Sequence, residues 1–142
     1  DTPAALWGVT PRDYVKIADP WPLNPDGQLM LGLKIEDREG VVIAEALASA
    51  AGLAFAEWGP GDMGMSYGYA DAHDPPYPPE LETARKTVKA ACDKTGLAFL
   101  SSWHDPNKTE QENVQFLFDW GVKVISCQTE ETKEAGLRLR PR

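Results

Sequence analysis

Four short apolar segments alternate with four segments of helical character, and this order constrains the fold more than any other feature of the chain. The predicted strands cover residues 29–36, 53–58, 97–100 and 122–126. The predicted helices between and after them cover residues 40–51, 80–95, 109–120 and 129–138. Strands of about five residues that alternate with helices and short links are typical of a parallel sheet in an α/β protein.

Glycines and helix-start signals mark the limits of these segments. Gly52, Gly96 and Gly121 each follow a predicted helix, at the position where glycine commonly ends one. Thr109 and Glu112 have the spacing of a capping box at the start of the third helix. We therefore expect the chain to turn back toward a new strand after each helix.

The length of 142 residues corresponds to one domain with a sizeable core. We divide it into a lead-in over residues 1–27, with a short helix at 11–18 and a proline-rich loop at 19–27, and a main part over residues 28–142. Four strands are half of a (β/α)8 barrel, which needs eight and typically spans about 250 residues. An open four-stranded sheet is the alternative. Either arrangement leaves strand edges unpaired, so we expect a homo-oligomer or a complementary N-terminal half.

Charge and composition exclude several classes of function. The net charge of −8 disfavours nucleic acid and anionic membranes as partners, because both select basic surfaces. The sequence contains no apolar run of transmembrane length and no signal-peptide pattern, and its first residue is not Met, so an upstream part is expected to have been removed. Cys92 and Cys127 lack metal-type spacing and lie in apolar contexts, which favours two packed, reduced thiols in a cytoplasmic protein over a disulfide.

Two carboxylates are expected to meet at the carboxyl ends of neighbouring strands. Glu36 ends the first predicted strand, and Asp62 follows the second within the turn Gly59-Pro60-Gly61-Asp62. Ligands of parallel α/β folds gather at this edge of the sheet. Two carboxylates suit Mg²⁺ or Mn²⁺, and the glycines free backbone N–H groups for an anion such as the carboxylate of a 2-keto acid. A structural pair of acids is the alternative, since acids at strand ends are common.

At these residues the chain resembles the HpcH/HpaI class II pyruvate aldolases, a family that includes citrate lyase-like members. The first strand ends in Ile35-Glu36-Asp37-Arg38-Glu39, similar to the family's aliphatic-Glu-x-Arg-Glu pattern. The second runs into Gly59-Pro60-Gly61-Asp62-Met63, similar to the family's Gly-Pro-Ala-Asp-Leu turn. Tyr67-Gly68-Tyr69 and His73-Asp74-Pro75 follow, where the family has a Gly-Tyr element and a His-Pro region. The resemblance covers residues 28–138.

The resemblance implies a phosphoenolpyruvate/pyruvate-type (β/α)8 lyase, of which this chain matches strands 5–8 with their helices. Glu36 and Asp62 would ligate a divalent metal, Mg²⁺ or Mn²⁺ with Co²⁺ as a further option. Gly59, Pro60, Gly61 and Asp62 would hold the carboxylate of a 2-keto acid. The reaction would cleave a 4-hydroxy-2-oxo acid to pyruvate and an aldehyde, with the metal stabilising the enolate.

The chain departs from the family in its proton-transfer residues. The family also uses an Arg and a His from the first half of the barrel, and no residue here aligns with either. His73 and His104 are candidates for proton transfer, with surface or structural roles as the alternative for each. Because this machinery is missing, a non-catalytic truncated barrel that binds a ligand or a partner is the alternative function.

Neighbouring residues have simpler interpretations. Lys34 is expected to be a charge partner of Glu36 rather than a Schiff-base lysine. Trp21, Trp58 and Trp103 either wall the mouth of the site or pack in the core.

Overall fold

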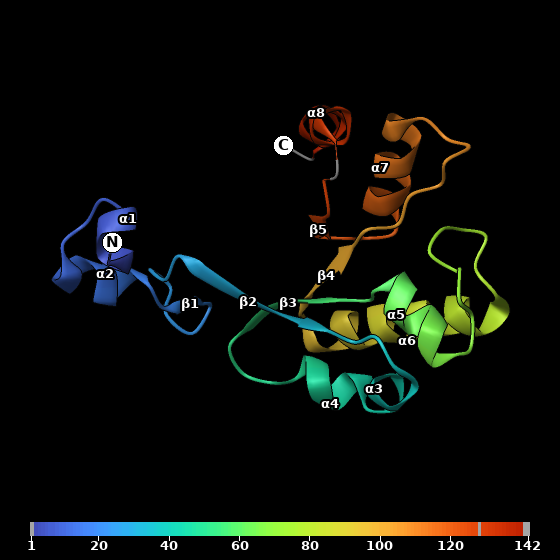
Figure 1. Cartoon of the computed structure of the whole chain (residues 1–142), viewed down its shortest axis with the longest axis horizontal. Helices are drawn as coiled ribbons and strands as arrows, with labels where there is room; N and C mark the ends of the chain where they lie inside the picture. The colour runs from blue at the N-terminus through green and yellow to red at the C-terminus, as the bar shows by residue number, and fades with distance from the viewer. Residues whose placement is uncertain (1, 128, 141–142) are drawn as a thin grey trace.

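The computed structural model describes residues 2–127 and 129–140 of the chain. Its centre is one sheet of five parallel strands in the order β1-β2-β3-β4-β5, so that each strand pairs with its neighbour along the sequence (Figure 1). The strands are β1 (Pro20–Trp21), β2 (Leu29–Lys34), β3 (Leu53–Glu57), β4 (Ala98–Ser101) and β5 (Val124–Ile125). This sequential parallel order is that of half a (β/α)8 barrel and confirms the predicted fold class.

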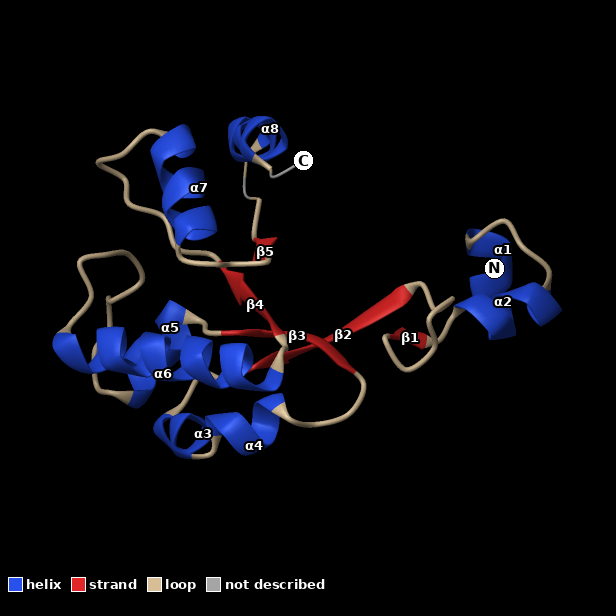
Figure 2. Ribbon diagram, turned by 180° about the vertical axis from the view of Figure 1, so that it is seen from behind, coloured by secondary structure: helices blue, strands red, loops and turns tan. Residues whose placement is uncertain are grey.

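Helices connect the strands. They are α1 (Pro3–Leu6), α2 (Pro11–Ile17), α3 (Arg38–Val42), α4 (Ala44–Ala48), α5 (Pro60–Ser66), α6 (Pro79–Thr95), α7 (Glu110–Asp119) and α8 (Glu130–Leu139). Helices α3, α4 and α6 pack together on one side of the strands, and α7 and α8 lie side by side beyond β5 (Figure 2). The lead-in with α1, α2 and β1 projects away from this body along β2 (Figure 1).

The core lies between the strands and α6. Apolar residues at helical spacing put Leu81, Val88 and Cys92 of α6 at 0% exposure. Alternate residues of β3 and β4 are buried against the helices, whereas the residues between them are only half-buried. This alternation gives the sheet a second, less covered face, which in a closed barrel would be the interior.

The lead-in is more ordered than the sequence indicated. Residues 3–6 form α1, with Thr2 as N-cap, in a lead-in for which the only predicted helix was at 11–18. The proline-rich loop contains the two-residue strand β1, which pairs in parallel with the start of β2. Proline has no N–H to donate, but a strand at the sheet edge needs donors on one side only. The sheet therefore has five strands instead of the four predicted.

Other boundaries also differ from the predictions, including the strand expected at 122–126, of which residues 124–125 form β5. The expected helix 40–51 is two short helices, because Ile43 leaves the helical conformation at φ −110° and ψ 18°. The first of them begins earlier than expected, at Arg38, where the Asp37 side chain caps Gly40 N–H. The expected glycine-rich turn after β3 is the start of α5, since Pro60 stands at the first helical position, where its fixed φ favours a helix.

The two cysteines differ in their environment, and both are free thiols. Cys92 is buried in the core, and burial raises the pKa of its thiol to about 11. Cys127 is exposed, so the expectation of two packed thiols is wrong for this residue. It follows β5 by two residues, where the short strand has already ended.

None of the helices within residues 2–127 and 129–140 has the length and apolar character needed to cross a lipid bilayer.

Candidate metal and keto-acid site

Strands β2 and β3 bring the two predicted carboxylates to one edge of the sheet. Lys34 and Glu57, the last residues of these strands, are partners in the parallel register, and Ile35 N–H donates to the Glu57 carbonyl at 2.9 Å. Ile35 is buried in the core, so the next side chain, Glu36, turns to the opposite side. Asp62 follows β3 in the first turn of α5.

Gly59 allows Glu36 to occupy its position. A Cβ built on Gly59 would collide with Glu36 Oε1, and Cδ of the same carboxylate would lie 2.9 Å from it. Any larger residue at position 59 would have to displace the carboxylate. The glycine is therefore required by the close approach of the acid, and Gly59 also serves as the N-cap of α5.

The carboxylate of Glu36 is incompletely satisfied. Its side chain is 20% exposed, and Oε1 is buried with no hydrogen-bond donor. Lys34 Nζ lies 2.7 Å from Oε1, but the contact lacks the angles of a hydrogen bond and is an ion pair. This confirms the prediction that Lys34 is a charge partner of Glu36.

Three carboxylates act on Lys34 together. The pKa of Lys34 is raised, first by its polar contact with Glu36 and further by the negative charges of Glu36, Glu57 and Asp62, against a lowering by partial desolvation. The ammonium group is thus attracted by all three carboxylates. A positive charge is favoured at this point, whether it comes from the lysine or from a bound cation.

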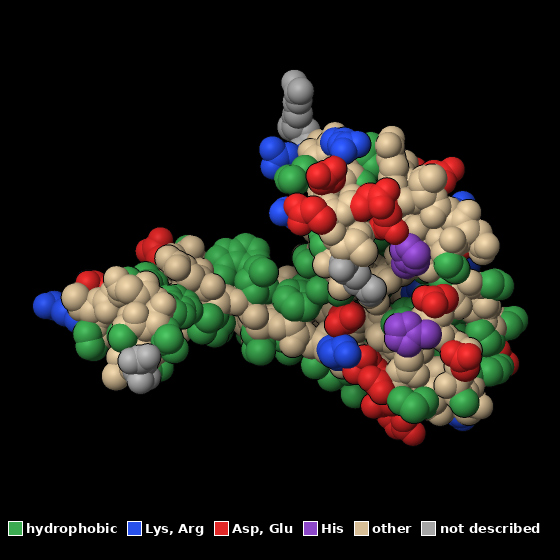
Figure 3. Space-filling model, turned by 45° about the horizontal axis from the view of Figure 1, so that its top comes forward, with side chains coloured by type: hydrophobic (Ala, Val, Ile, Leu, Met, Phe, Trp, Pro, Cys, Tyr) green, Lys and Arg blue, Asp and Glu red, His purple; other side chains and the backbone are tan. Residues whose placement is uncertain are grey.

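An open cleft of about 530 Å³ joins these groups. Its lining contains Lys34, Glu36, Glu57, Gly59, Pro60, Gly61, Asp62, Met65, Ala70, His73, Ser102 and Ser126. All the residues predicted to bind metal or substrate are among them. Figure 3 shows acidic side chains gathered with a basic group and both histidines of the chain on one face of the molecule.

Sequence reasoning missed three polar residues of the cleft. Glu57 lines the cleft because it stands opposite Lys34 in the register, and an acid at the last position of a buried strand was the available signal. Ser102 and Ser126 follow β4 and β5 and reach the cleft from its far side. Small hydroxyl residues after strands are too common to have indicated this.

The donor set fits a hard divalent cation. Within the described part of the chain, no group of three or more His, Cys, Asp or Glu side chains is arranged as a complete metal site. Mg²⁺ needs no such group, because it is usually bound through one or two carboxylates and keeps waters that substrate oxygens replace. The buried Glu36 Oε1, which is paired with the Lys34 ammonium group, and the Asp62 carboxylate in the same cleft are the features that fit it.

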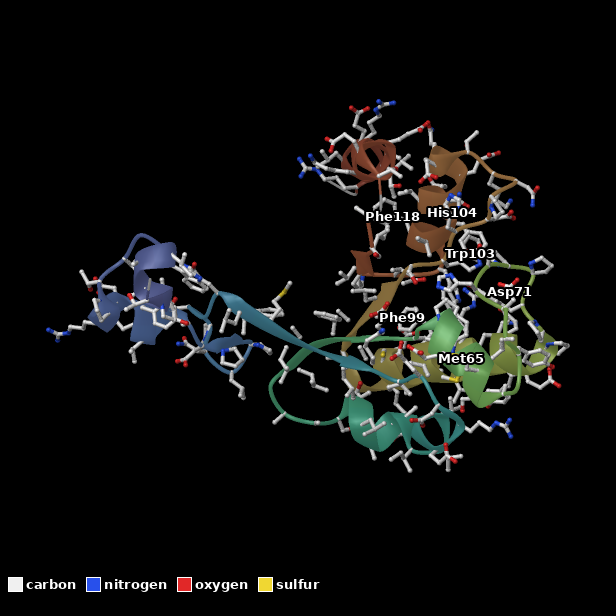
Figure 4. The ribbon with its side chains drawn as sticks, in the orientation of Figure 1. Met65, Asp71, Phe99, Trp103, His104 and Phe118 are labelled. Carbon is white, nitrogen blue, oxygen red and sulfur yellow. The ribbon has the colours of Figure 1, made fainter. Side chains whose placement is uncertain are left out.

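The two histidines lie in different surroundings. His73 lies against Gly61 in the cleft, with its side chain 68% exposed and its Nδ1 atom 3.9 Å from Asp74. His104 lies on the loop after β4 (Figure 4). Its Nε2 is 2.7 Å from Glu110 Oε1, and the other carboxylate oxygen of Glu110 accepts from the Thr132 hydroxyl at 2.6 Å. Glu110 was not predicted to have this role, since it stands inside the capping box of α7.

A smaller cavity of about 140 Å³ lies next to the cleft. It is enclosed by the loop after β4, the end of β5, and the first turns of α7 and α8. Trp103 (Figure 4) forms part of its wall. Its ring centroid lies 4.1 Å from that of Phe116. Of the other predicted wall residues, Trp58 is buried in the core against Tyr77, and Trp21 is exposed in β1. Neither lines the cleft or this cavity.

Replacing Glu110 with Gln is expected to lower the free energy of unfolding by about 1 kcal/mol at pH 7, because an amide accepts weaker hydrogen bonds than a carboxylate. The pKa of Glu110 is lowered, first by the Thr132 hydroxyl and then by His104, against partial desolvation. A lowered pKa in the folded state stabilises the fold above the ordinary glutamate value of about 4.3, and this contribution is lost as the pH falls from that value through the lower pKa of the folded state. Urea unfolding should therefore show the full difference at pH 7 and a much smaller one at about pH 2. A difference that is the same at both pH values would contradict this assignment.

Comparison with known proteins shows likeness in structure alone. No family model matches the chain, and neither does any curated protein. Among solved structures, an HpcH/HpaI aldolase/citrate lyase family protein from Burkholderia cenocepacia J2315 matches 95% of this chain and 46% of its own, at 24% identity and a TM-score of 0.65. The citrate lyase beta subunit from M. tuberculosis, complexed with oxaloacetate and magnesium, matches 76% and 52%, at 21% identity and a TM-score of 0.63. An HpcH/HpaI aldolase from Desulfitobacterium hafniense DCB-2 matches 88% and 44%, at 15% identity and a TM-score of 0.62.

These matches confirm the resemblance stated from the sequence at the level of fold. The chain spans about half of the length of the solved structures that it matches. That share agrees with a five-stranded part of a barrel.

Proposed function

We propose that the chain forms the metal- and pyruvate-binding half of a divalent-metal-dependent lyase, which cleaves 4-hydroxy-2-oxo acids to pyruvate and an aldehyde. The observation that carries the proposal is that the Glu36 and Asp62 carboxylates line one open cleft, where Glu36 Oε1 is buried and is paired with the Lys34 ammonium group. The likeness in fold to aldolase and citrate lyase proteins, one of them complexed with oxaloacetate and magnesium, supports the same chemistry.

Each group in the cleft has a role in this proposal. Glu36 and Asp62 would bind the ion, Mg²⁺ or Mn²⁺. Gly59 leaves room for the Glu36 carboxylate and Gly61 leaves room for the His73 ring, and with Pro60 they would form the part of the cleft that receives the keto acid. The backbone N–H groups of Gly61 and Asp62 lie in the first turn of α5, where N–H groups have no acceptor within the helix, and they would hold the substrate carboxylate.

Cleavage breaks the bond between C3 and C4 of the substrate. The electron pair remains on the pyruvate fragment as an enolate, the C4 hydroxyl loses its proton to become the aldehyde carbonyl, and C3 gains a proton. When bound, the ion would supply Lewis-acid stabilisation of the negative charge on the pyruvate oxygen. His73 is the histidine that lines the cleft, and it is proposed as the group that exchanges these protons with the substrate.

The test has two parts. Titration calorimetry should show Mn²⁺ binding to the chain, with pyruvate binding strengthened when Mn²⁺ is present. Incubation with 4-hydroxy-2-oxo acids and Mn²⁺ should release pyruvate, followed with lactate dehydrogenase and NADH. Pyruvate binding that does not depend on the metal would overturn the assignment of the site.

A non-catalytic binding module is the second candidate. The observation that favours it is that His73, the histidine of the cleft, has a side chain 68% exposed and lies 3.9 Å from Asp74, so it is weakly positioned for proton transfer. Metal-dependent pyruvate binding without any pyruvate release would select this candidate. Since β1 and β5 are the outer strands of the sheet, we further propose that a second copy or a complementary half covers these edges.

A further inference from the structure

We propose that the 140 Å³ cavity beside the cleft binds the side chain of the aldehyde half of the substrate, and that this side chain is compact and apolar, up to the size of a phenyl ring. The inference rests on the proposed function, since it assigns the part of the substrate that the metal does not hold. The carboxylates of the cleft would bind the metal ion, so they do not determine the chemical class of the aldehyde half.

The cavity and the cleft share part of their lining. Ser102 and Ser126 contribute to both, which places them at the passage between the two spaces. Both spaces lie at the carboxyl ends of the strands, with the cleft near β2 and β3 and the cavity near β4 and β5. A 4-hydroxy-2-oxo acid whose carboxylate lies near α5 would direct its C4 substituent across this passage.

The size of the cavity suits a small apolar group. An engineered apolar cavity of about 150 Å³ in another protein stays dry and binds benzene. One wall here is formed by Trp103, Val114, Leu117 and Ile125, and the rest by polar groups of α7, α8 and the loop after β4. An aromatic or branched side chain would remove apolar wall from water.

Several polar side chains around the cavity already have hydrogen-bond partners. Glu110 bonds to His104 and Thr132, and Asn113 bonds to the backbone N–H and carbonyl of Asp105. Among the described residues, the buried side-chain atoms without a partner belong to Glu36, Trp58 and Arg85, and none of these residues lines the cavity. No buried side-chain atom of the cavity therefore needs a hydrogen bond from a ligand, and this favours an apolar occupant over a charged one.

The loop on one side of the cavity is fixed in place before a ligand arrives. Asn113, only 2% exposed, holds Asp105 through both of its backbone bonds, and Trp103 N–H donates to the Ser101 hydroxyl at 3.1 Å. A wall that is already ordered lowers the entropy lost on binding.

The test uses 4-fluorobenzyl alcohol, a mimic of an aromatic aldehyde that cannot form an imine with lysine. Fluorine NMR titration of the wild-type chain should show saturable binding. Val114→Phe fills the cavity and should weaken this binding at least tenfold, while Val114→Ala enlarges it and should let a larger probe, 2-fluoronaphthalene, bind more tightly. Val122→Ala is the matched control, because Val122 is buried in the core and does not line the cavity.

The outcomes separate this proposal from the proposed function. No saturable binding in the wild type, or binding that Val114→Phe leaves unchanged in a folded protein, would overturn the cavity as a subsite. If Val114→Phe does not fold, the Val114→Ala variant serves as the test. The proposal is overturned if Val114→Ala changes the affinity for neither probe by more than the Val122→Ala control does. Mn²⁺ and pyruvate titrations on the same samples report on the cleft alone, so their failure would reject the lyase while leaving the cavity result intact.

Discussion

Replacing Asp62 with Asn is expected to weaken Mn²⁺ binding by about 100-fold, which corresponds to about 2.7 kcal/mol. The change keeps the size of the side chain and removes one of the two negative charges assigned to the ion. Hard cations such as Mn²⁺ and Mg²⁺ bind carboxylates far better than amides, and few other protein ligands are available in this cleft. Titration calorimetry at fixed ionic strength measures the affinity directly.

Glu36→Gln should produce a loss of similar size, because its Oε1 is the buried oxygen that has no other donor. Glu39→Gln is the control with the same change of charge: Glu39 is exposed in the first turn of α3 and does not line the cleft. Unfolding curves for the three variants show whether the fold is retained. Equal Mn²⁺ affinity in wild type and in both cleft variants would reject Glu36 and Asp62 as ligands.

The main course of the chain could be predicted because its signals are local. Each strand from β2 onward is a short apolar run, and Gly96 and Gly121 adopt the positive φ that ends a helix. The capping box at Thr109 and Glu112 forms as expected. These features depend on neighbours in sequence, so the residues alone indicate them.

The errors occurred where contacts distant in sequence decide the structure. Strand β1 forms because two residues of a proline-rich loop pair with the start of β2, and no periodic pattern in the sequence indicates this pairing. The helix expected at 40–51 is the exception, because it is interrupted at Ile43, the last of three consecutive β-branched residues, and this local signal disfavours helix. Both short helices pack against α6.

The residues of the candidate site also differ in whether the sequence indicates them. Glu36 and Asp62 were predicted because the carboxyl ends of adjacent parallel strands must meet. Glu57 enters the cleft through the register of β2 and β3, and Glu110 reaches His104 and Thr132 through the packing of α7 on α8. Register and helix packing are properties of the assembled fold, so no local pattern indicated these contacts beyond the acid at the end of a buried strand.

Replacing Lys34 with Met is expected to strengthen Mn²⁺ binding by about tenfold, or about 1.4 kcal/mol. The Lys34 ammonium lies 2.7 Å from Glu36 Oε1, the oxygen assigned to the ion, and its pKa is raised by that contact and by the charges of Glu36, Glu57 and Asp62. A divalent ion at Glu36 would have to displace this ammonium group or tolerate its charge nearby. Methionine keeps an unbranched side chain of similar length and removes both costs.

Lys86→Met is the matched control, because Lys86 is an exposed lysine of α6 that pairs with Glu82 and does not line the cleft. Raising the salt concentration should reduce the gain from Lys34→Met, because ions screen charges near the surface and the Lys34 side chain is 54% exposed. An unchanged affinity would show that the ion and the ammonium do not compete for Glu36. A weaker affinity would show instead that Lys34 holds Glu36 in place over Gly59, and that the ion needs this orientation more than it needs the lysine removed.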